Sequence, residues 1–379
     1  MIKSLNALRV LAEFWVVHQH LFGMEMNKSM DAFITSLMSF FFVLSGFVIT
    51  HAHRNNDLSS FESKKLFWLH RFRKVYPVFL FFWVFDIINQ AASGEFGRNP
   101  RLLLCSGLQL FMLNGWAGCR TDLANAPSWY ITTLAWFWFV FPWFHPVLNR
   151  FATCWPWTQM LVLNAVSFSI VAAMFPLGYW IYAPLPVVRI FEFYIGCVAA
   201  KTVETRLHWA WPLGAATLLF VFYVGMFYTA VLVPNKCEGG EWSFLEFMPF
   251  TDYCLLDWAY MTTTKFAVVW AVFIQWFAAS ELHNVPGRTF QFLEDSPLLQ
   301  TMNTFSLQLY LGHITFFKLL MGFALHMKFK SQLGLHTIFI IVYGLSYLMK
   351  LYVQPYLDRV VSPKQAFTEL QETEVLLQE

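Results

Sequence analysis

The chain has 379 residues, of which 58% are hydrophobic and 13% are charged, and its formal net charge at pH 7 is +2. This composition leaves too few polar side chains to cover a water-soluble globule of that length, so it predicts an integral membrane protein. The small net charge excludes the extended basic surface of a nucleic-acid-binding protein, and clusters of Lys and Arg are therefore interpreted as signals of membrane orientation.

The apolar stretches, taken in chain order, predict an all-α bundle of about ten transmembrane helices. A helix needs about 20 residues to cross ~30 Å of hydrocarbon, and each stretch is close to that length. A further run at 102–114 is shorter and contains polar residues, which favours an interfacial or re-entrant segment. The predicted spans lie at 4–23, 31–50, 75–90, 128–147, 159–180, 187–203, 209–232, 258–280, 304–325 and 337–355.

Cationic residues between the second and third stretches predict the orientation of the chain. Because cytoplasmic segments are enriched in Lys and Arg, this segment, the N-terminus and the C-terminus are all expected in the cytoplasm. Lys328 and Lys330 fall on the outer side in this scheme and are its one exception. Residues 1–361 are expected to form the transmembrane domain and 362–379 a polar cytoplasmic tail. The residues that carry the assignment are Arg54, Lys64, Lys65, Arg71, Arg73 and Lys74.

The six Cys residues show no metal-ligand spacing, so no metal site is predicted. Cys237 and Cys254 share a predicted outer loop, and Cys105 and Cys119 lie outside if 102–114 does not cross the membrane. Disulfides at these places and free thiols buried as small apolar groups are equally compatible with the sequence.

The first apolar stretch carries ionisable side chains, although each such group costs roughly 2.5–3.5 kcal/mol inside lipid. Arg9 and His20 lie eleven positions apart, which places them on one helix face to within about 20° and separates them by ~16 Å. Glu13 follows Arg9 by four residues and can form an ion pair with it. A polar stripe of this kind indicates either a catalytic site or a path for protons or solutes, so an enzyme and a proton-coupled transporter both remain hypotheses.

Six collinear motifs resemble those of acyltransferase family 3, a family of multi-pass membrane O-acyltransferases. The segment NALRVLAEFWVVHQH is similar to the opening signature of the family, in which ten residues separate an Arg from a His, here Arg9 and His20. The segment RFRKVYP resembles the basic run of the first cytoplasmic loop, with Arg71 and Lys74 in its two cationic positions. The other motifs are FFFVLSGFVIT (40–50), PSWYITTLAWFWFVFP (127–142), RIFEFYIG (189–196) and FSLQLYLGH (305–313).

The resemblance implies transfer of an acyl group from a cytoplasmic thioester, such as acetyl-CoA, to a hydroxyl that is often part of a sugar. The implied partners are the lipid bilayer, acyl-CoA as co-substrate and a hydroxyl-bearing acceptor, a carbohydrate in the first instance, with no permanently bound cofactor. His20 is the expected general base or transient acyl carrier, with Arg9 and Glu13 on the same helix. The residues expected to bind the phosphates of the donor are Arg71, Arg73 and Lys74, although orientation alone also explains their charge.

Five further residues in the matched motifs are candidates for contacts with the acceptor or with a channel. Each has a structural alternative. Arg189 and Glu192 can neutralise each other on one helix face, and His313 can form a polar contact between helices. Trp129 and Tyr130 can anchor the start of their span at the membrane interface.

Two positions depart from the family pattern. Many members carry a Glu shortly after the Trp that corresponds to Trp129, where this chain has Thr133, Leu134 and Ala135. In YVQPYLDR, Gln354 stands before the Pro, where a Glu is common. Glu13 is a candidate substitute for the missing acid. A family member that has lost catalysis and acts as a scaffold is therefore the third hypothesis.

Overall fold

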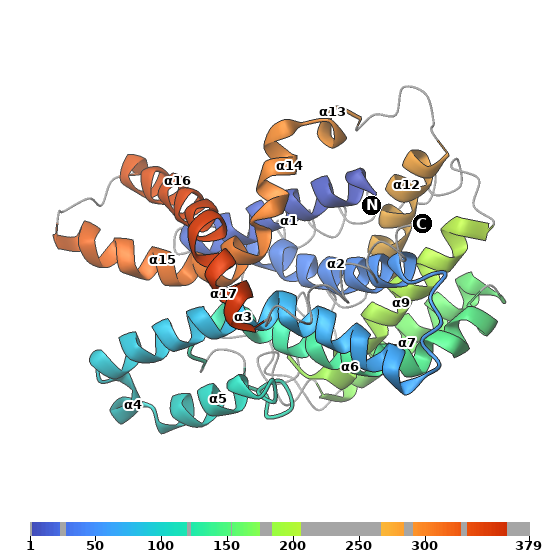
Figure 1. Cartoon of the computed structure of the whole chain (residues 1–379), viewed down its shortest axis with the longest axis horizontal. Helices are drawn as coiled ribbons and strands as arrows, with labels where there is room; N and C mark the ends of the chain where they lie inside the picture. The colour runs from blue at the N-terminus through green and yellow to red at the C-terminus, as the bar shows by residue number, and fades with distance from the viewer. Residues whose placement is uncertain are drawn as a thin grey trace, which may run out of the picture. The chain divides into compact units, whose positions relative to one another are not determined.

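The computed structural model describes residues 2–22, 28–119, 123–152, 154–174, 184–205, 267–283, 291–326 and 332–361. All regular elements in these ranges are helices, labelled in Figure 1, so the predicted all-α class is confirmed for the described part of the chain. Contacts divide the chain into two compact units, which are described separately. Unit 1 comprises Met1–Ala52 and Val147–Asp295, and unit 2 comprises His53–Pro146 and Ser296–Glu379.

Three helices in the described ranges are long and apolar enough to cross a membrane: Phe61–Ala92, Ala126–Phe151 and Gly334–Arg359. Shorter apolar helices at Ser36–Ala52, Pro156–Val171 and Ala267–Leu282 accompany them. These lengths and this composition are those of a membrane protein, as the sequence predicts. The span expected at 209–232 lies outside the described residues.

Unit 1 is organised around a close crossing of two helices, α2 and α9. A Cβ atom placed on Gly46 of α2 would lie 1.9 Å from the carbonyl oxygen of Phe193, and Gly196 of α9 makes the reciprocal approach to α2. Phe42 and Arg189 also contact each other, and each lies four residues before its helix's part in the Gly46–Phe193 contact. The order of contacts is therefore the same on both helices, so α2 and α9 run in the same direction. The helices of this unit are α1 (Lys3–Phe22), α2 (Lys28–Ala52), α7 (Pro156–Met174), α9 (Pro186–Thr205), α12 (Ala267–Leu282), α13 (Gln291–Glu294) and the end of α6.

A carboxylate from α12 caps the start of α1. The backbone N–H groups of Lys3 and Ser4 donate to the two carboxylate oxygens of Glu281, over 2.9 and 2.8 Å. A negative charge at a helix N-terminus satisfies N–H groups that have no partner within the helix and interacts favourably with the helix dipole. The start of α1 therefore lies against the last turns of α12.

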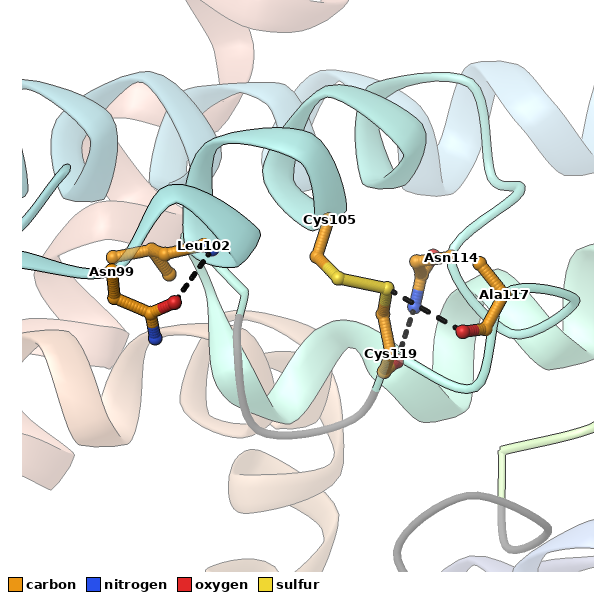
Figure 2. Close-up of a disulfide and its surroundings, with 6 residues drawn as sticks. All are labelled: Asn99, Leu102, Cys105, Asn114, Ala117 and Cys119. Carbon is orange, nitrogen blue, oxygen red and sulfur yellow. Dashed lines mark hydrogen bonds between the residues drawn. A yellow bond between two sulfur atoms is a disulfide. The ribbon is translucent and has the colours of Figure 1, made fainter.

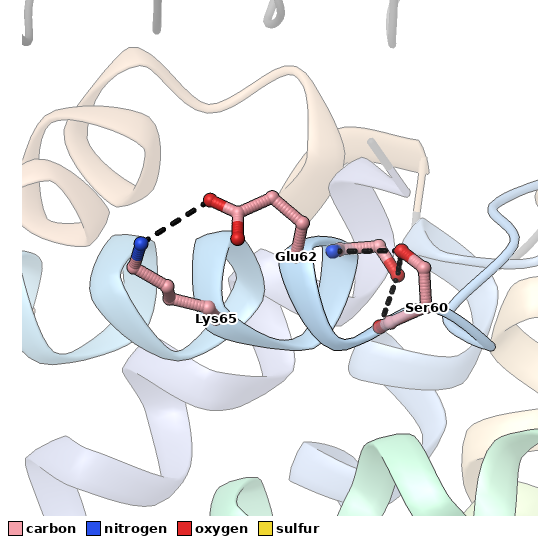
Figure 3. A network of polar contacts seen from close by, with 4 residues as sticks. Ser60, Glu62 and Lys65 are labelled. Carbon is pink, nitrogen blue, oxygen red and sulfur yellow. Dashed lines mark hydrogen bonds and ion pairs between the residues drawn. The ribbon is translucent and has the colours of Figure 1, made fainter.

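Unit 2 begins with α3, which starts earlier than the sequence predicts. The expected span was 75–90, preceded by a basic loop, whereas α3 extends over Phe61–Ala92. Ser60 caps the helix by accepting a hydrogen bond from the N–H of Ser63, and Glu62 pairs with Lys65 one turn later (Figure 3). The basic run between this cap and the apolar stretch consists of good helix formers, so the helix continues through it. At about 1.5 Å per residue, α3 is longer than a bilayer is thick.

The segment after α3 is folded back and held by a disulfide. Helix α5 (Pro100–Leu110) is capped by the side chain of Asn99 and has 11 residues, too few to span a membrane, as expected for 102–114. Cys105 and Cys119 form a disulfide that ties α5 to the loop behind it, and Asn114 donates to the carbonyl of Cys119 (Figure 2). Of the two alternatives for these thiols, the disulfide is the one present. Cys237 and Cys254 lie outside the described residues.

Helix α15 packs along α3 in unit 2. Gly312 of α15 faces the ring of Phe82, and one turn later Thr315 faces Asp86, so α15 and α3 run in the same direction. The last span is interrupted by a π-helical segment, Met349–Val353, which widens the helix just ahead of Pro355, a residue without an N–H. The remaining helices of this unit are α4 (Glu95–Arg98), a 3-10 turn (Ala126–Ser128), most of α6 (Trp129–Phe151), α14 (Pro297–Thr304), α15 (Ser306–His326), α16 (Gln332–Leu348) and α17 (Gln354–Val361).

Candidate functional site

Arg9, Glu13 and His20 all lie on α1, in unit 1. Glu13 is buried at 3% exposure, Arg9 is half-buried, and His20 is exposed in the last turn of the helix. The carboxylate is therefore inside the unit while the imidazole, about two turns further along, is accessible from outside it. An exposed imidazole can reach a substrate, and pairing of the Glu13 carboxylate with Arg9 stays a prediction.

Arg189 and Glu192 form an ion pair in the interior of unit 1. The Nη1 atom of Arg189 lies 2.7 Å from Oε1 of Glu192, and both side chains are 0% exposed. The guanidinium also lies 5.7 Å from the centre of the Phe42 ring. This geometry matches mutual neutralisation, the structural alternative stated above, and acceptor contact by these residues stays a prediction.

The predicted donor-binding run belongs to unit 2 and lies on α3 rather than in a loop. Arg71 and Arg73 are half-buried, and Lys74 is exposed. Nη2 of Arg71 lies 3.4 Å from Nε2 of His53, and its guanidinium lies 5.7 Å from the centre of the Phe67 ring. Phosphate binding by these three residues stays a prediction. The contacts with His53 and Phe67 hold the side chain of Arg71 in place.

His53 and His145, which the sequence does not single out, complete the surroundings of Arg71. The Nε2 atom of His145 lies 3.1 Å from the carbonyl oxygen of His53, and the Asn56 amide lies 2.8 Å from Nδ1 of His53. Burial, followed by the charges of Arg71, His145 and His70, lowers the pKa of His53 from 6.5 to about 3. His53 is therefore a neutral acceptor at physiological pH.

Trp129, Tyr130 and His313 are buried in unit 2. The exposed fractions of Trp129 and Tyr130 are 6% and 8%, so both rings lie inside the protein and the alternative of interfacial anchoring is wrong. Tyr130 contacts Tyr310, whose hydroxyl donates to the carbonyl of Pro127 over 2.7 Å. His313 is 0% exposed, and its Nδ1 faces the carbonyl of Tyr310 at 2.8 Å. Contact of these residues with an acceptor stays a prediction.

The two positions that depart from the family pattern carry neutral hydrogen-bonding groups. The hydroxyl of Thr133 donates to the carbonyl of Trp129 within the same helix, over 2.9 Å. Gln354 accepts from Gln308 over 3.0 Å and donates to Asp358 over 2.6 Å. Both side chains are thus engaged with the protein itself, and neither supplies a carboxylate.

A buried polar cluster that the sequence analysis missed joins α3, the 123–128 segment and α15. The Oδ2 atom of Asp86 accepts hydrogen bonds from Asn125 at 2.9 Å and from Thr315 at 2.8 Å. Gln109 of α5 donates to the carbonyl of Asn125 at 2.7 Å and to the hydroxyl of Ser128. A single carboxylate in an otherwise apolar stretch was the signal that could have revealed the cluster, because such groups are rare inside membranes.

Replacing Asp86 with Ala is expected to lower the stability of the protein by about 2–3 kcal/mol, because the donors on Asn125 and Thr315 lose their acceptor while still buried. Thr315→Val removes only one of these bonds and should cost less. The measurement is the thermal unfolding midpoint of the purified full chain in detergent. Asn89→Ala, at an exposed position on the same helix, is the control, and an equal loss there would refute the role of the cluster.

Comparison with known proteins places these observations in a family context. A family model described as an acyltransferase domain, that of acyltransferase family 3, matches residues 2–351. Acyltransferase MdmB of Streptomyces mycarofaciens is 27% identical to this chain over 250 residues, which cover 59% of this chain. The same alignment covers 63% of MdmB, a little under two thirds of its length. No solved structure matches the chain.

Proposed function

Because the chain belongs to acyltransferase family 3, we propose that it is a membrane O-acyltransferase that moves an acyl group from cytoplasmic acyl-CoA to a hydroxyl of an acceptor. The observation that carries this proposal is the family match, which covers residues 2–351 and includes Arg9, His20 and the basic run on α3. By the resemblance of the motifs, acetyl is the proposed acyl group and a carbohydrate the proposed acceptor.

The proposed orientation places the start of α3 in the cytoplasm and its end on the outer side. The basic residues lie near the start of α3, while the Cys105–Cys119 disulfide follows its end, and disulfides persist in oxidising compartments rather than in the cytosol. The relative directions of packed helices agree with the proposed ten-span scheme. In that scheme α2 and α9 both run inward, and α3 and α15 both run outward, in agreement with the contacts within each pair.

His20 is the proposed catalytic residue, in one of two roles. As a general base, its imidazole accepts the proton of the acceptor hydroxyl while the hydroxyl oxygen attacks the thioester carbonyl. The carbon–sulfur bond then breaks, and the departing CoA thiolate takes up that proton. As an acyl carrier, the imidazole attacks first, CoA leaves as a thiol, and the hydroxyl displaces the imidazole from the acyl group. Both routes yield the same ester and the same free CoA.

The test supplies membranes that contain the chain with acetyl-CoA radiolabelled in its acetyl group. We expect free CoA thiol and a labelled ester that mild base releases, both above the level in membranes without the chain. Absence of both products would contradict the proposal and favour the scaffold hypothesis, which the missing carboxylates near Thr133 and at Gln354 motivate. Release of thiol without a labelled ester would indicate hydrolysis of the donor instead of transfer.

A further inference from the structure

The guanidinium of Arg71 is held inside unit 2 without an acidic partner among the described residues. Its one hydrogen-bonding neighbour there is Nε2 of His53, at 3.4 Å, and its Nε–H group is buried without an acceptor. A guanidinium has five N–H donors and no acceptor, and burying it is costly unless an anion compensates its charge. The remaining donors of Arg71 are therefore available to an anion that arrives from outside the protein.

The groups around Arg71 are arranged to favour a phosphate. Arg71, His145 and His70 each act electrostatically on His53, so the basic groups gather around one ring. Asp57 interacts electrostatically with His145, but it is exposed and accepts two hydrogen bonds from Ser59. A phosphate would supply the negative charge that is missing around Arg71. Its oxygens can accept two parallel hydrogen bonds from the planar guanidinium.

His53 determines the orientation of the Arg71 guanidinium. Because a guanidinium can only donate, Nε2 of His53 accepts the hydrogen bond, and the ring must be neutral. The ring packs edge-on against Phe67, whose centre is 5.0 Å away, and the backbone carbonyl oxygen of His53 lies 3.1 Å from Nε2 of His145. His53 thus joins the turn after α2, helix α3 and helix α6 at the side chain of Arg71.

We propose that His53 is a positioning residue for the acyl donor, holding the Arg71 guanidinium so that its remaining N–H groups bind a phosphate of CoA. The inference rests on the proposed function, which supplies CoA as the ligand. His53 does not touch the reacting carbonyl, so its loss raises the KM for the donor and leaves the rate at saturating donor unchanged.

Two substitutions of His53 distinguish the role of its hydrogen-bond acceptor from that of ring packing. His53→Phe keeps a ring against Phe67 but removes the nitrogen that accepts from Arg71, whereas His53→Gln keeps an acceptor. Binding of CoA to the full chain in phosphatidylcholine nanodiscs should weaken about tenfold or more in His53→Phe and remain near wild type in His53→Gln. Binding of pantetheine, which lacks phosphate, should be the same in all three proteins. His336→Ala, at an exposed histidine of α16, is the matched control.

Acidification supplies a second readout. Between pH 6.5 and 3 the unfolded chain binds a proton at His53 that the folded chain does not, because the pKa of His53 is lowered to about 3 in the folded state. Wild type should therefore lose thermal stability as the pH falls from 7 to 5. His53→Gln should lose less, since it has no group that titrates there. An equal loss in both proteins would contradict a neutral His53 in the folded state.

Three results would overturn the inference. CoA binding by His53→Phe at the wild-type level would remove the positioning role and leave the proposed function intact. Equal weakening for CoA and pantetheine would show that the effect does not act through phosphate. If phosphatidylglycerol in the nanodiscs weakened CoA binding by wild type but not by His53→Phe, the site would belong to a lipid headgroup. Failure of wild type to bind CoA at all would instead refute the proposed function.

Discussion

Replacing His20 with Ala is expected to lower the rate of acyl transfer by a factor of about 10² to 10⁴, the usual contribution of a positioned proton-transfer group. His20 is exposed at the end of α1, so its removal leaves no cavity in the core, and the protein should accumulate to the wild-type level. The measurement is transfer of labelled acetyl from acetyl-CoA in membranes, normalised to the amount of folded protein. The loss of rate does not distinguish the base role of His20 from the carrier role. Only the carrier role forms a labelled acyl-protein in the wild type.

His18→Ala is the control for this substitution. His18 lies two residues before His20 on the same helix, is half-buried and stacks on Phe14 at 6.1 Å, so it points away from the position of His20. It should retain most of the activity. Full activity of His20→Ala would end the proposed mechanism, and equal losses in both variants would indicate damage to α1 rather than to chemistry.

Replacing Gly46 with Ala is expected to destabilise the protein by at least about 2 kcal/mol, because the helices have no room for a methyl group. The added Cβ would lie 1.9 Å from the carbonyl oxygen of Phe193 and 3.2 Å from the N atom of Cys197. Both are backbone atoms, so no side-chain rotation relieves the overlap and α2 must move away from α9. The measurement is the thermal unfolding midpoint in detergent, together with the yield of monodisperse protein.

Gly344→Ala is the matched control for the Gly46 variant. Gly344 also lies in an apolar helix, α16, but a Cβ placed there would meet no atom within 4 Å. The substitution should be neutral or mildly stabilising, because Ala favours a helix by about 1 kcal/mol over Gly. Equal midpoints for the Gly46 and Gly344 variants would show that the α2–α9 crossing tolerates separation. Small residues at such crossings are a general means of close packing between membrane helices.

The candidate site could be predicted from the sequence only where the chemistry is local. Arg9, Glu13 and His20 lie within one helix, so spacing alone relates them. The surroundings of Arg71 were not accessible in this way, because its partner His53 is 18 residues earlier and His145 lies on another helix. Asp86 escaped attention for the same reason, since its partners Asn125 and Thr315 are 39 and 229 positions away.

The sequence by itself determined that the chain is helical, that it is a membrane protein and that it belongs to its family. Apolar length, composition and short motifs are properties of neighbouring residues, and these decide whether a segment can satisfy its backbone hydrogen bonds inside lipid. The tertiary structure decided that α3 begins at its Ser60 cap, that Gly46 admits the backbone of α9, and that Arg71 faces a neutral His53 without an acid. Each of these depends on which distant segments are packed together, because packing alone sets the partners and the burial of a charge.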